Sequence, residues 1–168
     1  IKDAEGAEEL YTMNENARLK ACEEARPIYE LQHSIIEVMN PPLFIALHGG
    51  GENTGIFQQR WNSEKLKMNY NTIYIQSSQV FSTDRYWWED VRKGSSDISA
   101  MLDSADIVKT SAKDITIGGF SHSGRMALYY FLNSDLNIKK VIMLCPEINL
   151  DEFYSQQMID KIKNNEVE

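Results

Sequence analysis

Apolar and polar residues fall into alternating blocks along the chain, and these blocks predict helices interleaved with short strands. Residues 4–25 are rich in Ala, Glu, Leu and Lys, which favour helix, and they carry only a thin apolar stripe. Pro27 interrupts any helical continuation. Residues 28–39 indicate an edge strand, IYELQ, followed by a second short piece. We therefore expect a surface helix and then an edge strand at the beginning of the chain.

The pattern sharpens from Pro41 onward. Residues 43–47, LFIAL, form a continuous apolar run that ends abruptly in glycines, which is typical of a strand buried on both faces of a parallel sheet. Further short strands are expected at residues 72–76, 114–120 and 140–145. Helices are expected at residues 56–68, 89–102, 125–132 and 153–162, with a polar and aromatic loop at residues 77–88. This alternation predicts an α/β protein with a doubly wound, mostly parallel sheet. Residues 1–40 then form an N-terminal helical and edge segment, and residues 41–168 form the core.

Composition and charge exclude several classes of function. The chain has 168 residues, 42% hydrophobic and 25% charged, which excludes a disordered or fibrous protein. Its net charge of -8 argues against a nucleic-acid binder and against docking on an anionic membrane. No apolar run approaches the ~20 residues of a membrane span, and the N-terminal residues lack the layout of a signal peptide. The two cysteines, Cys22 and Cys145, are too few for a disulfide framework, so we expect a reducing, cytoplasmic environment.

A glycine-rich segment at residues 118–124, GGFSHSG, is the first candidate for chemistry. It follows a predicted strand, precedes a predicted helix and matches the pattern small-x-Ser-x-small around Ser121. A nucleophilic serine on such a sharp turn needs small residues two positions before and after it, so that strand and helix can pack closely. Ser121 is therefore the candidate nucleophile. The alternatives are a plain connecting turn and a phosphate-binding loop.

A second glycine run, HGGG at residues 48–51, ends the buried strand at residues 43–47. The tetrahedral intermediate of acyl transfer carries an oxyanion that two N–H donors stabilise, each worth about 2.7–4 kcal/mol by mutagenesis. Glycines allow the backbone to turn its N–H groups toward a substrate. We predict that one donor is the N–H of His122 and that the other comes from Gly50 or Gly51.

Together, PLFIALHGGG and GGFSHSGRMAL resemble the α/β-hydrolase fold, and within it the carboxylesterase/phospholipase and dienelactone-hydrolase-like serine hydrolases. The resemblance covers about residues 41–148. It implies hydrolysis of a small-molecule carboxylic ester, or of a thioester or amide, through an acyl-serine on Ser121 and without a cofactor. One departure is Ser123, where members of this family often have glycine, although serine is still small.

The resemblance also implies a triad acid and a histidine after the nucleophile, in that order. Glu147 and Asp151 are weak candidates for the acid, but no histidine follows His122. His48 is expected to have a structural role, His122 to project away from the hydroxyl, and His33 is a poor candidate for the base.

We interpret the chain, which does not begin with Met, as the front part of a longer hydrolase that lacks its C-terminal strands. On that interpretation the 168-residue form is inactive or nearly so, and its exposed sheet edge favours self-association. The oligomeric state itself cannot be read from the sequence. A rival interpretation is a non-catalytic binding protein of the same fold, and a weaker one is a flavodoxin-like nucleotide binder.

Several other residues have both a functional and a structural interpretation. Aromatic residues in the loop at residues 79–88, and the polar residues before it, would lie where substrates bind in open α/β sheets. Core packing or a solvated loop explains them equally well, and Cys145 is expected to be a buried packing residue. No residues have metal-ligand spacing or match a dinucleotide or Walker pattern. The candidates in this group are Trp61, Gln76, Ser77, Ser78, Trp87 and Trp88.

Overall fold

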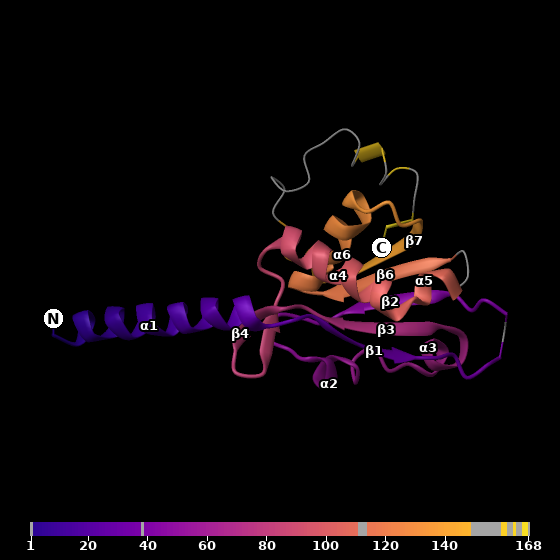
Figure 1. Cartoon of the computed structure of the whole chain (residues 1–168). Helices are drawn as coiled ribbons and strands as arrows, with labels where there is room; N and C mark the ends of the chain where they lie inside the picture. Colours follow the sequence, from indigo (N-terminus) through magenta and orange to yellow (C-terminus); the bar gives the residue numbers. More distant parts are fainter. Residues whose placement is uncertain are drawn as a thin grey trace.

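A computed structural model of the chain describes residues 2–37, 39–110, 114–148, 159–160, 163 and 166–167 (Figure 1). The helices are α1 (Lys2–Glu24), α2 (Thr54–Phe57), α3 (Glu64–Asn69), α4 (Val91–Ala105), α5 (Ile107–Thr110) and α6 (His122–Asn133). The strands are β1 (Ile28–Gln32), β2 (Leu43–Leu47), β3 (Asn71–Gln76), β4 (Gln79–Ser82), β5 (Arg85–Trp87), β6 (Ile115–Phe120), β7 (Ile138–Leu144) and β8 (Glu166–Val167).

The main sheet has six strands in the order β1-β3-β2-β6-β7-β8. β1 pairs with β3 antiparallel, and the other neighbours pair in parallel. All residues of β2 and β3 are buried, as the continuous apolar runs predicted. The predicted α/β class, the mostly parallel sheet and the edge strand IYELQ are therefore confirmed.

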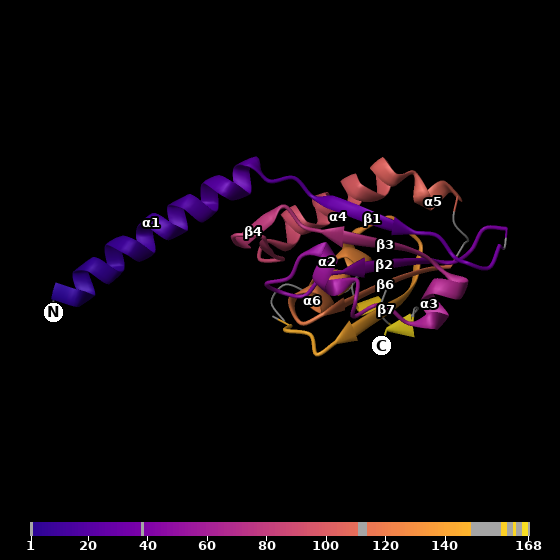
Figure 2. The same cartoon turned by 90° about the horizontal axis from the view of Figure 1, so that it is seen from below.

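Helices cover both faces of this sheet, with α4 and α6 on one side and α2 and α3 on the other (Figures 1 and 2). Alternate residues of β2 explain the two layers. Leu43, Ile45 and Leu47 pack in the larger core, which includes residues of α4 and α6. Phe44 and Ala46 pack in a smaller cluster with residues of the opposite layer. The strand is apolar at every position because both of its faces are covered.

Helix α1 extends away from the body of the molecule, and only its C-terminal part lies against β4 (Figure 2). Arg18 donates a hydrogen bond to the carbonyl of Val80, and the thiol of Cys22 accepts one from the N–H of Val80. Leu10 and Tyr11, farther toward the N-terminus, are exposed. The predicted surface helix is confirmed, with a smaller contact than its apolar stripe suggested.

Two local predictions are wrong. The helix expected at residues 56–68 is divided into α2 and α3, because the hydroxyl of Ser63 accepts the N–H of Leu66 and begins a new helix there. The loop expected at residues 77–88 contains the hairpin of β4 and β5. Asp84 turns this hairpin with a positive φ of 58°. The aromatic residues in this segment are the ones that favour strand.

The edge of the sheet beside β7 also differs from expectation. Lys140 and Val141 pair with the two residues of β8, a strand that the sequence did not predict. The rest of β7 has no strand partner on that side among the residues that the structure describes. The helix expected at residues 153–162 lies almost wholly outside the described residues.

Candidate active site

Ser121 lies at the sharp turn between β6 and α6, and its backbone has φ 58° and ψ -123°. This left-handed φ is strained for a residue with a Cβ. The turn leaves no space for larger neighbours: a Cβ on Gly119 would lie 2.2 Å from the carbonyl oxygen of Ser123, and one on Gly124 would lie 3.2 Å from Cβ of Pro146. The Ser121 hydroxyl has no hydrogen bond to any described residue. The strand-turn-helix context predicted for this serine is present.

Ser123 is fully buried and fixes the turn from inside. Its Oγ lies 2.8 Å from the N–H of Phe120, which donates to it, and 3.1 Å from the carbonyl oxygen of Leu47. The hydroxyl therefore links the turn to the end of β2, where the HGGG run begins. A glycine at this position would lack that link.

Near the turn, the backbone N–H groups of His122 and Gly50 are without an acceptor among the described residues. A Cβ on Gly50 would lie 3.4 Å from Nδ1 of His122, so the glycine run is beside the beginning of α6. The N–H of Gly51 is already used, because it donates to the carbonyl of Tyr86 at 2.9 Å. Of the two glycines proposed from the sequence, the hydrogen bonding favours Gly50.

Glu52 holds the glycine run in place, a role that the sequence analysis missed. Its buried carboxylate accepts the N–H of Gly49 at 2.8 Å and pairs with Arg60 at 2.8 Å. The guanidinium of Arg60 lies 5.8 Å from the ring centre of Phe120, directly before Ser121. The sequence signal that could have indicated this role is a carboxylate directly after three glycines. The sequence does not show that Glu52 also pairs with Tyr86 in the hairpin.

His48 has the structural role expected of it. The ring is fully buried, with Nδ1 2.7 Å from the carbonyl oxygen of Gly49, and Nε2 accepts the N–H of Ser77 at 3.2 Å. These contacts identify Nδ1 as the protonated nitrogen. Burial lowers the pKa of His48 to about 4, so the ring is neutral near pH 7.

His122 and Glu147 lie together, with His122 Nε2 3.1 Å from Glu147 Oε2. The His122 ring also meets the edge of Trp87, with ring centres 4.3 Å apart. Burial lowers the pKa of His122 more than the nearby Glu147 carboxylate raises it. Asp151, the other acid candidate, lies outside the described residues.

His33 lies at the wrong edge of the sheet to serve Ser121. It follows β1, whose last residue pairs with Thr72, and Thr72 pairs with Phe44 near the beginning of β2. This is the amino-terminal edge of the parallel strands, whereas Ser121 follows the carboxyl end of β6. None of the three histidines forms a hydrogen bond with Ser121.

No family model matches this sequence, and a search of curated proteins finds no match. Solved structures do match. An uncharacterized protein from Bacillus cereus ATCC 10987 is 28% identical with a TM-score of 0.66, over 81% of this chain and 44% of that one. The Bacillus cereus carboxylesterase is 16% identical with a TM-score of 0.59, over 78% of this chain and 65% of that one. Est1E from Butyrivibrio proteoclasticus, with ferulic acid bound, is 20% identical with a TM-score of 0.58, over 74% and 51%.

The chain has the α/β-hydrolase fold. It spans about half the length of the solved structures that it matches, from 44% to 65% for these three. The likeness confirms the fold predicted from the two glycine motifs.

The other candidate residues have mostly structural contacts. Trp88 is fully buried, and its indole N–H donates to the carbonyl of His48. Three further candidates are buried and hydrogen-bonded to other parts of the protein. Gln76 accepts the N–H of Thr54. Ser77 donates to the carbonyl of Trp87, and Ser78 donates to the carboxylate of Asp97. They do not face a substrate as the sequence analysis allowed.

Cys145 is exposed, which corrects the expectation of a packing residue. It has a positive φ of 47°, because the chain turns sharply at the end of β7. Trp61 is half-buried and tilts against Phe44, with ring centres 5.0 Å apart, so it packs on the smaller cluster. Within the described ranges, no group of three His, Cys, Asp or Glu side chains is placed to hold a metal ion. Within the same ranges, the helices are all too short or too polar for a membrane crossing.

Proposed function

We propose that this protein hydrolyses carboxylic esters through an acyl-serine intermediate on Ser121. The observation that carries the proposal is the strained turn that presents Ser121 at the beginning of α6, with the N–H of His122 directly after it. A helix N-terminus stabilises negative charge that develops there. The fold shared with the Bacillus cereus carboxylesterase and with Est1E supports the same assignment.

The chemistry needs one nucleophile and two N–H donors. Oγ of Ser121 attacks the carbonyl carbon of the ester, and the carbonyl oxygen becomes an oxyanion that the N–H groups of His122 and Gly50 stabilise. Collapse of this intermediate breaks the bond to the alcohol, which leaves with a proton. Water then attacks the acyl-serine and releases the acid. A thioester or amide differs only in its leaving group, so the same site accommodates either.

The attack also requires a base to take the proton of Ser121. None of the three histidines is placed to act as this base. His48 is buried and hydrogen-bonded to Ser77, His122 is paired with Glu147, and His33 lies at the other edge of the sheet. This observation favours a second candidate, a binding protein that retains the turn without a complete triad. Removal of a triad member leaves only ~10³–10⁴-fold catalysis over water.

Turnover of p-nitrophenyl acetate separates the two candidates. We expect the complete gene product to hydrolyse this ester and Ser121→Ala to abolish turnover, while the 168-residue chain alone is inactive or nearly so. An intact mass of the purified sample shows which form is assayed. A complete gene product that binds the ester but never turns it over identifies the binding protein. Brisk, Ser121-dependent turnover by the 168 residues alone would place the base within them.

A further inference from the structure

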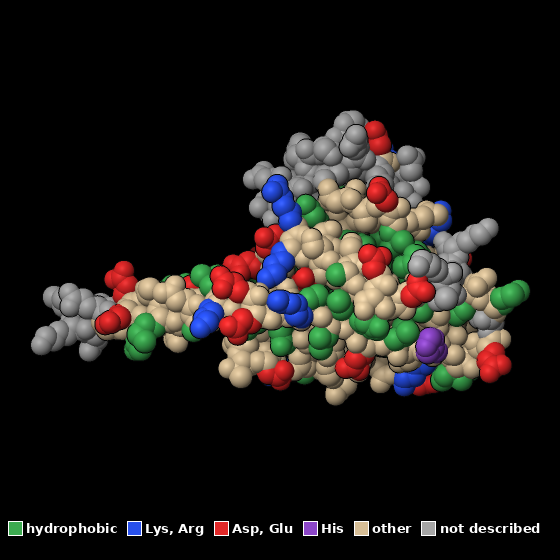
Figure 3. All heavy atoms as spheres, in the orientation of Figure 1, with side chains coloured by type: hydrophobic (Ala, Val, Ile, Leu, Met, Phe, Trp, Pro, Cys, Tyr) green, Lys and Arg blue, Asp and Glu red, His purple; other side chains and the backbone are tan. Residues whose placement is uncertain are grey.

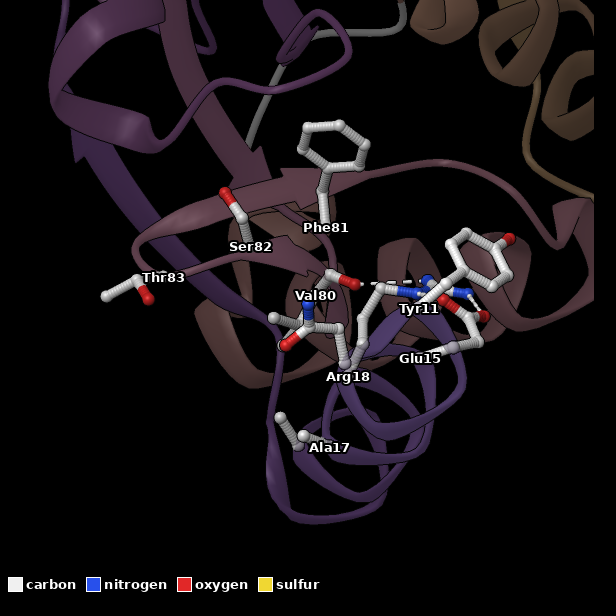
Figure 4. A pocket seen from close by; sticks show the side chains of 10 residues that line it. Tyr11, Glu15, Ala17, Arg18, Val80, Phe81, Ser82 and Thr83 are labelled. Carbon is white, nitrogen blue, oxygen red and sulfur yellow. Dashed lines mark hydrogen bonds and ion pairs between the residues drawn. The ribbon is translucent and has the colours of Figure 1, made fainter. Parts of the chain in front are cut away.

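A groove lies between α1 and the hairpin of β4 and β5 and extends to His122. It consists of two adjoining cavities of about 440 and 540 Å³ that share Tyr11, Glu15, Arg18 and Phe81. Figure 4 shows the side chains that line the smaller cavity. Figure 3 shows acidic and basic side chains interspersed where α1 joins the body of the molecule.

One end of this groove reaches the candidate active site. Trp87 and His122 line the larger cavity, and His122 directly follows Ser121. A row of rings continues away from the serine: His122 meets Trp87 at 4.3 Å, and Trp87 stacks on Phe81 at 4.6 Å with an interplanar angle of 29°. The other end is lined by Ala17, Ala21 and Val80.

The charged groups in the groove neutralise one another. Arg18 pairs with Glu15 at 2.6 Å on its own helix and with Glu89 at 3.2 Å across the groove. It also donates to the carbonyl of Val80, so the same side chain anchors α1 to the hairpin. Arg125 also lines the larger cavity and donates to the carbonyl groups of Trp88 and Glu89. The two carboxylates of the groove are thus matched by two guanidinium groups, so the groove has no excess charge for a charged ligand, and its aromatic walls favour a flat apolar one.

We propose that this groove binds a planar aromatic group carried by the ester substrate, on either its acid or its alcohol side. The proposal rests on the proposed ester hydrolysis and adds to it a class of substrate and a role for α1 as a wall of the binding site. Such a ring lies against the Phe81–Trp87 pair, where aromatic contacts add about 0.5–1.5 kcal/mol beyond area burial. Tyr11, exposed on α1, closes the opposite side of the groove.

A binding experiment tests the groove without requiring turnover. Binding of methyl 2-naphthoate to the Ser121→Ala protein is measured by quenching of tryptophan fluorescence. Ala17→Trp fills the groove and is expected to raise the dissociation constant about tenfold, and Phe81→Ala is expected to weaken binding in the same direction. Asn16→Trp is the matched control, because Asn16 is exposed on α1 and does not line the groove. An unchanged dissociation constant in both Ala17→Trp and Phe81→Ala overturns the proposal.

Turnover identifies which side of the ester carries the ring. With otherwise wild-type complete gene product, kcat/KM is compared for methyl 2-naphthoate, 2-naphthyl acetate and ethyl acetate. We expect Ala17→Trp to lower kcat/KM about tenfold for one naphthyl ester and to leave ethyl acetate within about twofold. The affected ester shows whether the acid or the alcohol occupies the groove. If Ala17→Trp leaves kcat/KM unchanged for all three esters, the proposal for the groove is wrong and the proposed hydrolysis stands. If the groove variants weaken binding but no ester is turned over, the proposed hydrolysis is wrong and the groove stands.

Discussion

The hydroxyl of Ser123 lies 3.1 Å from the carbonyl oxygen of Leu47 and joins two segments that are 76 positions apart in the chain. One segment is the turn that carries Ser121, and the other is the end of β2, where the HGGG run begins. The position of the proposed nucleophile relative to the proposed oxyanion donors therefore depends on a side chain outside the proposed reaction. Its Oγ also accepts the N–H of Phe120, and its one proton is shared between two acceptors, the carbonyl oxygens of Leu47 at 3.1 Å and Phe120 at 2.9 Å.

Replacing Ser123 by alanine is expected to lower the free energy of unfolding by about 1–3 kcal/mol, because the partly buried N–H of Phe120 and the buried carbonyl of Leu47 each lose a hydrogen bond to Oγ. Chemical denaturation measures the change. Ser96→Ala is the control, since that hydroxyl is exposed on α4 and its loss is expected to cost less than about 0.5 kcal/mol. Equal stabilities of the two variants would show that the Ser123 contacts contribute nothing.

Glu52 is expected to act as a positioning residue for the glycine run. Glu52→Ala leaves the N–H of Gly49 without its acceptor, and we expect a loss of about 1–3 kcal/mol in the free energy of unfolding together with a fall in kcat larger than any change in KM. Glu52→Gln retains an acceptor oxygen, so we expect it to keep most of the free energy of unfolding and most of kcat. Arg60→Gln removes the ion pair of a half-exposed side chain and its contact with the Phe120 ring, at a cost of about 1 kcal/mol. A glutamine variant as impaired as the alanine variant contradicts this role.

His48 is expected to make stability fall in mild acid. Its pKa is about 4 in the folded protein against an ordinary 6.5, so the unfolded chain takes up a proton that the folded ring does not. One such group lowers the free energy of unfolding by about 1 kcal/mol between about pH 7.5 and about pH 5.5. The lowered pKa of His122 acts in the same direction. Denaturation at both pH values tests this, and His48→Asn is expected to show a smaller drop in the free energy of unfolding. An equal drop in the variant would show that another group causes the pH dependence.

Gly50→Val is expected to lower kcat about a hundredfold with little change in KM, because the displaced N–H contacts the oxyanion chiefly in the transition state. A Cβ there lies 3.4 Å from Nδ1 of His122 and 3.4 Å from the ring of Trp87, so the stability of the variant is measured beside its turnover. Gly55→Val, at an exposed glycine of α2, is the control. Ester turnover checks the pair, and full activity in folded Gly50→Val would make the run purely structural.

The elements around the candidate site could be predicted because their signals are local. Five consecutive apolar residues specify β2, and the glycines around Ser121 specify a turn too tight for any larger side chain. The alternation of strands and helices indicated the α/β class, and the resemblance carried by those two motifs implied the α/β-hydrolase fold.

The missed features are long-range contacts. Glu52 forms a bridge with Tyr86, which joins the end of the glycine run to the hairpin of β4 and β5. The contact of His122 with Glu147 joins a helix to the end of a neighbouring strand. Single-sequence patterns carry no information about either, so the environment of Ser121 required the structure.

Labelling with a fluorophosphonate probe tests the central claim most directly. The complete gene product is treated with the probe, and the modified peptide is identified by mass spectrometry. We expect one adduct on Ser121, no adduct in Ser121→Ala, and undiminished labelling of a control such as Ser96→Ala, whose hydroxyl lies on the exposed face of α4. Equal labelling of the Ser121→Ala protein, or an adduct on another residue, would contradict the assignment of Ser121 as the nucleophile.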